Sequence, residues 1–251
     1  KKTRTIGLFI IDRGHVAGDA LSNLLITNVI ERSSEHGYYV LTRILRNVQD
    51  KDTIRSVKEA FYQRRIEGGI FIGAANHEPI VEELIAEGYI IGVFDHRLPG
   101  REEPNRVAAS FDNERGMALA VAYLASLGHT RIGTVSGDLR RRSGIDRLEG
   151  FLAAMKQHGL DIRQEWLLSG DFNEDAGYEA MADFLGRGIP LPTAFIAAND
   201  SAAFGMLRAL RERAIRVPEE LSLIGFDDHA FSSRQQPALT TVRIDFDDVM
   251  S

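Results

Sequence analysis

Acidic and amide side chains recur directly after the apolar, strand-like runs of this sequence. They stand in Ile11-Asp12-Arg13, Phe94-Asp95-His96, Ser136-Gly137-Asp138, Gly170-Asp171-Phe172, Ala198-Asn199-Asp200 and Phe226-Asp227-Asp228. Carboxylates accept hydrogen bonds and carboxamides donate and accept them, which suits vicinal hydroxyls, and an aromatic ring such as Phe172 can cover the apolar face of a sugar. The pattern indicates a binding site for a small polar molecule. At any single position the alternative is a helix N-cap, because Asp and Asn cap helices well.

An arginine-containing segment follows one of these positions. Arg147, within Gly144-Ile145-Asp146-Arg147-Leu148-Glu149-Gly150, can present a fork of hydrogen-bond donors to the same ligand. The alternative is a solvated arginine on a helix surface, which spacing alone does not exclude. The run Arg140-Arg141-Arg142 favours a solvated turn over an anion clamp.

The motifs of familiar catalytic sites are missing from the sequence. There is no G-x-G-x-x-G after a strand, no Walker A loop, no G-x-S-x-G elbow and no H-E-x-x-H. The lack of cysteine excludes a disulfide framework and thiolate metal sites. The histidines show no metal-ligand spacing; they are His15, His36, His77, His96, His129, His158 and His229. We therefore expect neither an enzyme nor a bound metal or cofactor.

The composition is that of an ordinary globular chain. Its 251 residues are 44% hydrophobic and 26% charged, enough for one large or two medium domains. No run approaches the ~18–20 apolar residues of a membrane span, and no signal-peptide core follows Lys1–Thr5. The net charge of −6 makes the chain a poor electrostatic match for DNA or an anionic membrane. The absence of cysteine fits a cytoplasmic protein.

Strand-like and helical patterns alternate along the chain. Short apolar runs rich in β-branched residues predict strands at 5–11, 39–45, 69–72, 90–94, 131–135, 194–197 and 221–226. Amphipathic stretches of helical length separate these runs. Several of the stretches end at a glycine before the next strand, which predicts helix C-caps at Gly37, Gly88, Gly128 and Gly159.

This alternation predicts an α/β fold with parallel sheets and helices on both faces. The strands lack strict alternation of apolar and polar residues, as expected when both of their faces are covered. The polar, turn-rich stretch 97–106 separates two groups of β–α units and predicts two similar doubly wound lobes. In open α/β sheets, ligands bind outside the carboxyl ends of the strands, where the acidic and amide side chains stand.

Six segments stand in an order and spacing typical of one known family. They are Phe111–Gly116, Leu127–Gly133, Arg147–Phe151, Ala198–Gly205, Val217–Asp228 and Pro237–Arg243. Together they resemble the effector-binding core of the LacI/GalR family of bacterial transcription regulators. The resemblance spans nearly the whole chain and implies a two-lobed fold like that of the type I periplasmic sugar-binding proteins, with a small effector held between the lobes. By analogy, residues 1–109 and 242–251 form the N-terminal lobe and residues 110–241 the C-terminal lobe.

The resemblance also implies which residues meet the effector. In such regulators the positions that match Asp95, Arg147, Asn199 and Asp227 face the ligand. Phe172 matches an aromatic residue that packs against it.

Further positions are implied less directly. Ser143 and Arg141 match positions just upstream of the arginine that contribute in some relatives, and Asn113 is expected to cap its helix. Two positions depart from the family's pattern. His96 replaces an arginine common in relatives and is a shorter, titratable donor. Ile244 stands where some sugar-responsive relatives place glutamine, which removes a polar contact.

The loop at 12–19 lacks the aromatic residues that relatives often carry there. Asp12, Arg13 and His15 are therefore candidates to form that side of the site. A neutral sugar or polyol is the expected effector, because carboxylate acceptors are numerous at the strand ends. An anionic effector is the alternative if Arg13, Arg141 and His96 turn inward.

The family also implies partners. A helix-turn-helix headpiece precedes the core in such regulators and is absent here, so we expect this chain to be a core fragment, or the ordered part, of a longer protein. The implied partners are a small-molecule effector, a second copy of the chain in a homodimer, and operator DNA bound through the headpiece. Two alternatives stay open: a periplasmic sugar-binding protein of an ABC transporter, which shares the fold, and an α/β enzyme acting on a dinucleotide or phosphosugar.

Overall fold

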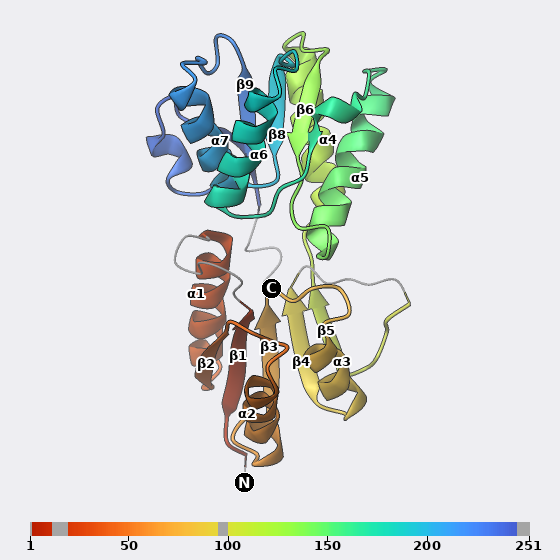
Figure 1. The fold of residues 1–251 in the computed structure, drawn as a ribbon. Helices are drawn as coiled ribbons and strands as arrows, with labels where there is room; N and C mark the ends of the chain where they lie inside the picture. The colour runs from red at the N-terminus through yellow and green to blue at the C-terminus, as the bar shows by residue number, and fades with distance from the viewer. Residues whose placement is uncertain (1, 12–19, 95–99, 245–251) are drawn as a thin grey trace. The chain divides into compact units, whose positions relative to one another are not determined.

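The computed structural model describes residues 2–11, 20–94 and 100–244 (Figure 1). The candidate residues Asp12, Arg13, His15, Asp95 and His96 therefore lie outside the described residues. The chain forms two compact units, with the division between Ser110 and Phe111. Each unit is described by itself below.

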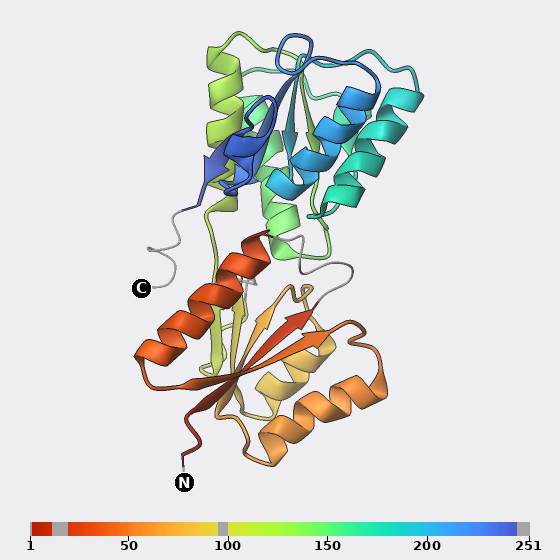
Figure 2. The same ribbon diagram turned by 90° about the vertical axis from the view of Figure 1, so that its left-hand side faces the viewer.

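The first unit contains a five-stranded parallel sheet. Its strands are β1 (Thr5–Ile11), β2 (Tyr39–Leu45), β3 (Gly68–Ile72), β4 (Ile90–Phe94) and β5 (Arg106–Ala109), in the order β2-β1-β3-β4-β5. Its described helices are α1 (Ala20–Glu35), α2 (Lys51–Tyr62) and α3 (Pro79–Ala86). Figure 2 shows α1 on one face of the sheet and α2 and α3 on the other.

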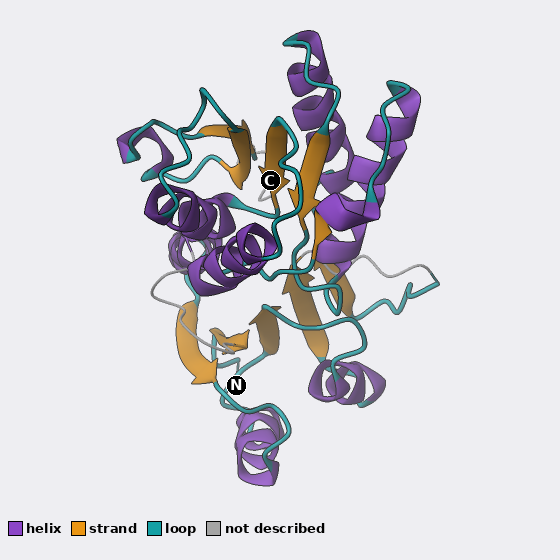
Figure 3. Cartoon of the chain, turned by 45° about the horizontal axis from the view of Figure 1, so that its top comes forward, coloured by secondary structure: helices purple, strands orange, loops and turns teal. Residues whose placement is uncertain are grey.

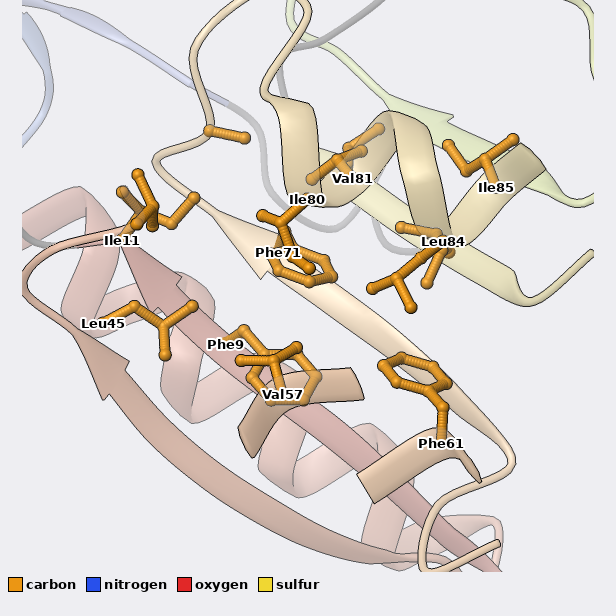
Figure 4. Packing of buried hydrophobic residues seen from close by; sticks show 14 of the residues in the cluster. Phe9, Ile11, Leu45, Val57, Phe61, Phe71, Ile80, Val81, Leu84 and Ile85 are labelled. Carbon is orange, nitrogen blue, oxygen red and sulfur yellow. The ribbon is translucent and has the colours of Figure 1, made fainter. Parts of the chain in front are cut away.

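The core of the first unit lies beneath α2 and α3. Val57 and Phe61 of α2 pack with Leu84 of α3 onto Phe9 and Phe71 of the sheet (Figure 4). The two sheet rings are stacked, with their centroids 4.9 Å apart. This face of the sheet is buried and apolar, so it supplies most of the unit's hydrophobic stabilisation.

The opposite face of β4 and β5 is open in the described part of the unit. Ile90 is 58% exposed and Val107 is 57% exposed. With Ile6, Ile70 and Phe94 they line an apolar groove of about 390 Å³. The expectation that helices cover both faces of the strands thus holds only in part for this sheet.

The second unit contains another five-stranded parallel sheet. Its strands are β6 (Ile132–Val135), β7 (Leu167–Leu168), β8 (Ala194–Ala197), β9 (Ser222–Asp227) and β10 (Thr240–Arg243), in the order β10-β9-β8-β6-β7. Its helices are α4 (Asn113–Ser126), α5 (Arg142–Gln157), α6 (Glu174–Gly186) and α7 (Asp200–Glu212), with short 3-10 turns η2 (Gln164–Trp166) and η3 (Ser232–Arg234). When the strands are numbered in chain order within each unit, the two sheets have the same strand order.

Helices cover both faces of the second sheet, as Figure 3 shows. One core cluster joins α4 and α5 to the sheet through Val121, Phe151 and Ile224. Another joins α6 and α7 to the opposite face through Phe184 and Phe195. Every residue of β8 is fully buried, as expected for a central strand covered on both sides.

The predicted α/β fold with two parallel sheets is confirmed. The glycines at 37, 88, 128 and 159 all have positive φ angles after their helices, as C-caps require. The sequence missed β5, β7 and β10. The turn-rich stretch 97–106 is not the division between the units, because β5 begins at Arg106 and pairs with β4. Val242 and Arg243, predicted for the N-terminal lobe, pair with β9 in the second sheet.

Among the described helices, none is long and apolar enough to cross a membrane.

Candidate functional site

Arg147 is the centre of the polar contacts at the carboxyl edge of the second sheet. It lies in the second turn of α5 and is 2% exposed. Nε donates to Asn113 Oδ1 at 2.8 Å, Nη1 to the Ala198 carbonyl oxygen at 2.5 Å, and Nη2 to Asp227 Oδ1 at 3.2 Å. These acceptors belong to the start of α4 and the ends of β8 and β9. Within the described residues, the contacts use three of the five guanidinium N–H groups.

The Arg147 guanidinium also lies against aromatic rings. Its Cζ is 3.8 Å from the ring centroid of Phe226 and 5.3 Å from that of Phe172. The Arg141 guanidinium is 4.9 Å from the Phe172 centroid. The Phe172 ring rests on the backbone at Gly137, where a Cβ atom would come within 2.2 Å of it. The predicted aromatic residue is thus held at the site by cation–π contacts and by the absence of a side chain at position 137.

Asp227 supplies the charge that matches Arg147. The pair is nearly removed from water, with side chains 3% and 7% exposed. A buried ion of either sign is costly without its partner, so the two residues depend on each other. Asp227 has a φ of 108° and the next residue, Asp228, a φ of 56°. Such angles are unfavourable for residues with side chains, and surrounding contacts must hold them.

Asn199 is the N-cap of α7. Its Oδ1 accepts from the Ala202 amide at 2.8 Å, and its Nδ2 donates to the Phe172 carbonyl oxygen at 2.9 Å. The capping alternative is therefore realised at this position. The same side chain also ties the loop that carries Phe172 to α7, so it shapes the site as well as ending the helix.

Asn113 does not cap its helix. Asp112 is the N-cap of α4 and accepts from the Arg115 amide at 3.0 Å. Asn113 is the first residue of the helix, is 2% exposed, and accepts from Arg147. The expectation was wrong because a cap and its neighbour look alike in sequence, whereas the acceptor role depends on a residue 34 positions away.

Comparisons with known proteins identify the fold's relatives. The family described as a periplasmic binding protein-like domain matches residues 121–250. The ribose operon repressor of Escherichia coli (strain K12) is 31% identical over 244 residues, covering 96% of this chain and 70% of the repressor. The HTH-type transcriptional repressor PurR of Klebsiella pneumoniae (strain 342) is also 31% identical over 244 residues, covering 96% and 68%.

Solved structures carry the family name. A LacI family transcriptional regulator from Mycobacterium smegmatis is 27% identical, with a TM-score of 0.81, covering 98% of this chain and 86% of that one. The chain belongs to the LacI family. A sugar-binding LacI-family regulator from Escherichia coli, solved with phosphate, is also 27% identical, with a TM-score of 0.76, covering 100% and 87%.

The predicted resemblance is thereby confirmed, and the chain is the effector-binding domain of a LacI-type transcriptional regulator. The repressor relatives decide against the transporter alternative. These relatives are transcriptional regulators.

The other predicted residues of this LacI-family site lie at the start of α5. Ser143 is 3% exposed in the first turn, and Arg141 occupies the N-cap position without a side-chain cap. Next to them, Arg140 holds Asp138 through both carboxylate oxygens, at 2.8 and 2.9 Å. Burial raises the pKa of Asp138, but the hydrogen bonds from Arg140 outweigh it and leave the pKa below its ordinary value.

Asp200 was not predicted as a functional residue, although it lies in the segment Ala198–Gly205. Asp200 is 1% exposed, and its carboxylate accepts from the Ser232 hydroxyl, the Thr241 hydroxyl and the His229 amide. Burial raises its pKa, against the opposing effect of these hydrogen bonds. The capping rule suits either of two adjacent polar residues and gives no signal for one whose side chain turns inward.

A buried polar group also lies at the carboxyl edge of the first unit's own sheet. Asn76, in the loop between β3 and α3, has a buried Oδ1 without a hydrogen-bond partner among the described residues. Its neighbour His77 has a positive φ of 57°. Neither residue belongs to a sequence motif, so only the structure singles them out.

The described residues offer one cluster of acids within reach of a common metal ion, formed by Glu114, Asp146 and Glu149. Asp146 is ion-paired with Arg142, and the two glutamates are exposed. Because an exposed, partly neutralised cluster is common on protein surfaces, we assign it no metal.

Proposed function

We propose that this LacI-family domain binds a small neutral sugar or polyol at the carboxyl edge of the second sheet, and that binding controls attachment of the regulator to operator DNA. Arg147 and Asp227 are the principal ligand contacts in this proposal, and Asn199, Ser143 and Phe172 line the site. The observation that carries it is the buried, ion-paired Arg147 at the edge where open α/β sheets bind ligands.

The charges around Arg147 favour a neutral ligand over an anion. Three nearby arginines are ion-paired with aspartates, as Arg140–Asp138, Arg142–Asp146 and Arg147–Asp227. An anion would compete with these carboxylates for the guanidinium groups, whereas a sugar hydroxyl can donate to the carboxylates and accept from the arginines. Arg141 is the cation through which an anionic ligand would be recognised instead.

The relatives support the same ligand class. One of the relatives that are 31% identical is a ribose operon repressor, and one at 27% identity is a sugar-binding regulator. D-ribose is therefore the first probe to try. D-galactose, D-xylose and D-sorbitol test whether another sugar or a polyol fits better.

The proposed mechanism is a shift of population between conformations of a homodimer. An effector that binds one conformation more tightly raises the fraction of the protein in that conformation. The coupling free energy between an effector site and a second binding site is typically ~1–3 kcal/mol. Operator DNA would be contacted by a helix-turn-helix part of the regulator, since the net charge of −6 makes this domain itself a poor partner for DNA.

Isothermal titration calorimetry with the four probes tests the proposal. We expect one probe to bind the unmodified chain and to lose at least tenfold in affinity in Asp227→Asn, which keeps the size of the side chain and tolerates a positive φ. Arg216→Ala, which removes a surface ion pair with Glu220 at a side chain that is 71% exposed, is the control and should bind within twofold of the unmodified chain. Equal binding by Asp227→Asn would refute the site. Binding of a phosphosugar in place of the four probes would refute the ligand class.

A further inference from the structure

Asp200 joins three segments of the second unit through one buried carboxylate. Its Oδ1 accepts from Thr241 Oγ1 of β10 at 2.6 Å. Its Oδ2 accepts from Ser232 Oγ of η3 at 2.6 Å and from the His229 amide at 2.8 Å. The last two groups belong to the segment that follows β9. The carboxylate therefore fixes that segment to β10.

Thr241 extends this connection to the residue next to the effector contact. Its hydroxyl donates to Asp200 and also accepts from the Asp228 amide at 3.2 Å. Asp227 and Asp228 both have positive φ angles, at 108° and 56°. Because these angles are unfavourable for residues with side chains, the contacts of Asp228 help to keep Asp227 turned toward Arg147.

The sheet leaves space for this carboxylate at Gly225. A Cβ atom at that position of β9 would lie 2.0 Å from Asp200 Oδ1. A residue larger than glycine would therefore displace either the strand or the carboxylate. The close approach is built into the strand that ends at Asp227.

The helix itself does not explain these contacts. Asn199 caps α7 and accepts from the Ala202 amide, so the N-cap position does not depend on Asp200. The helix dipole stabilises a negative charge in the first turn and does not require the side chain to point in one direction. The carboxylate of Asp200 instead accepts from groups outside its own helix.

We propose that Asp200 is a positioning residue of the effector site, which acts through Thr241 and the 228–232 segment to hold Asp227 in the conformation that meets Arg147. This inference rests on the proposed function, because it takes Asp227 as an effector contact. It adds a residue that touches no ligand and that links the site to β10.

Thr241 offers the cleanest test, because two substitutions separate its hydroxyl from its bulk. Thr241→Val keeps the shape and removes the hydroxyl, whereas Thr241→Ser keeps the hydroxyl and removes a methyl group. Asp200→Asn keeps the size of the side chain and removes its charge and one acceptor oxygen. Met181→Ala, at a fully buried residue of α6, is the control for loss of stability alone.

The first measurement needs no ligand. Crystal structures of the Val and Ser variants give the Asp227 backbone and the distance from Arg147 Nη2 to Asp227 Oδ1, which is 3.2 Å here. We expect the Val variant to lose this contact, with a separation beyond the hydrogen-bond limit of about 3.5 Å, and the Ser variant to keep it. An unchanged contact and an unchanged φ at Asp227 in the Val variant would overturn the proposal.

The second measurement is affinity for the sugar or polyol that binds the unmodified chain among D-ribose, D-galactose, D-xylose and D-sorbitol. We expect Thr241→Val and Asp200→Asn to weaken it at least tenfold at a temperature where each is folded, with Thr241→Ser and Met181→Ala within threefold. Wild-type affinity in both Thr241→Val and Asp200→Asn would overturn the proposal. If the unmodified chain binds none of the four, the proposed ligand class is refuted, and the two crystal structures by themselves decide whether Asp200 positions Asp227.

Discussion

Each unit buries an ion-paired arginine: in the first unit it stands where a strand begins, and in the second it lies at the edge where strands end. Arg106 begins β5, its side chain is 2% exposed, and it pairs with Glu82 at 2.7 Å and Glu103 at 2.9 Å. Arg147 lies at the carboxyl edge of the second sheet and binds an amide, a carbonyl and a carboxylate from three segments. Burial and ion pairing alone therefore do not identify a ligand site.

The two arginines differ in what their partners can do. The partners of Arg106 are carboxylates of partly exposed side chains, one on α3 and one in the loop before β5. The cluster therefore attaches the edge of the sheet to the helix. The partners of Arg147 belong to the start of α4 and to the ends of β8 and β9, with an aromatic ring beside them. A ligand that contacts Arg147 or Asp227 would therefore act on the ends of several strands at once. This arrangement suits a domain that changes conformation on binding.

Removal of Arg147 should give the largest effect. Arg147→Ala leaves Asp227 buried without its cation and should lower the free energy of unfolding of the second unit by about 3–5 kcal/mol. Urea denaturation followed by circular dichroism measures the loss. A loss below about 1 kcal/mol would mean that the pair is no more important than a surface ion pair.

Arg106→Ala sharpens the comparison. It should cost about 1–3 kcal/mol of stability, because two partly exposed glutamates lose their donor and can turn toward water. Effector affinity, measured by calorimetry on the folded variant, should stay within twofold of the unmodified chain. A tenfold loss of affinity would show that the arginine of the first unit belongs to the site.

Gly137→Ala tests whether the Phe172 ring must lie on the backbone. The added Cβ would come within 2.2 Å of the ring, so we expect about 1–3 kcal/mol of overpacking and a weaker effector affinity. Gly186→Ala is the matched control, because nothing lies within 4 Å of its added Cβ. Thermal unfolding of the two variants should separate them. Similar melting temperatures would mean that Phe172 moves aside without cost.

The smallest expected effect concerns pH at the cluster of the first unit. The hydrogen bond from Arg106 is the main cause that lowers the pKa of Glu103 from 4.5 to about 2. A carboxyl group with a depressed folded-state pKa stabilises the fold above its unfolded pKa, and this is lost as pH falls from 4.5 toward 2. Glu103→Gln should therefore flatten the acid side of the stability curve. An unchanged pH dependence of the urea midpoint would contradict the assignment.

Much of the fold could be predicted from the sequence because buried strands are apolar. The strands that escaped prediction have other compositions: β5 begins with Arg106, β10 reads Thr-Thr-Val-Arg, and β7 has two residues. Their places in the sheets come from pairing with neighbours that are distant in sequence, and local patterns do not encode such pairing.

The site was less predictable than the fold. The resemblance pointed to Arg147 and Asp227, and the structure brings these two together across 80 positions of sequence. The roles of Asn113 and Asp200 depend on which way a side chain turns at a helix start. Sequence rules for caps treat the adjacent residues at such a start alike.

The most direct test of the central claim is a crystal structure of the chain with the probe that binds it. We expect sugar hydroxyl oxygens within hydrogen-bond distance of Arg147 and Asp227, with Phe172 against the sugar ring. A sugar bound elsewhere, such as in the apolar groove of the first sheet, with Arg147 and Asp227 untouched, would contradict it.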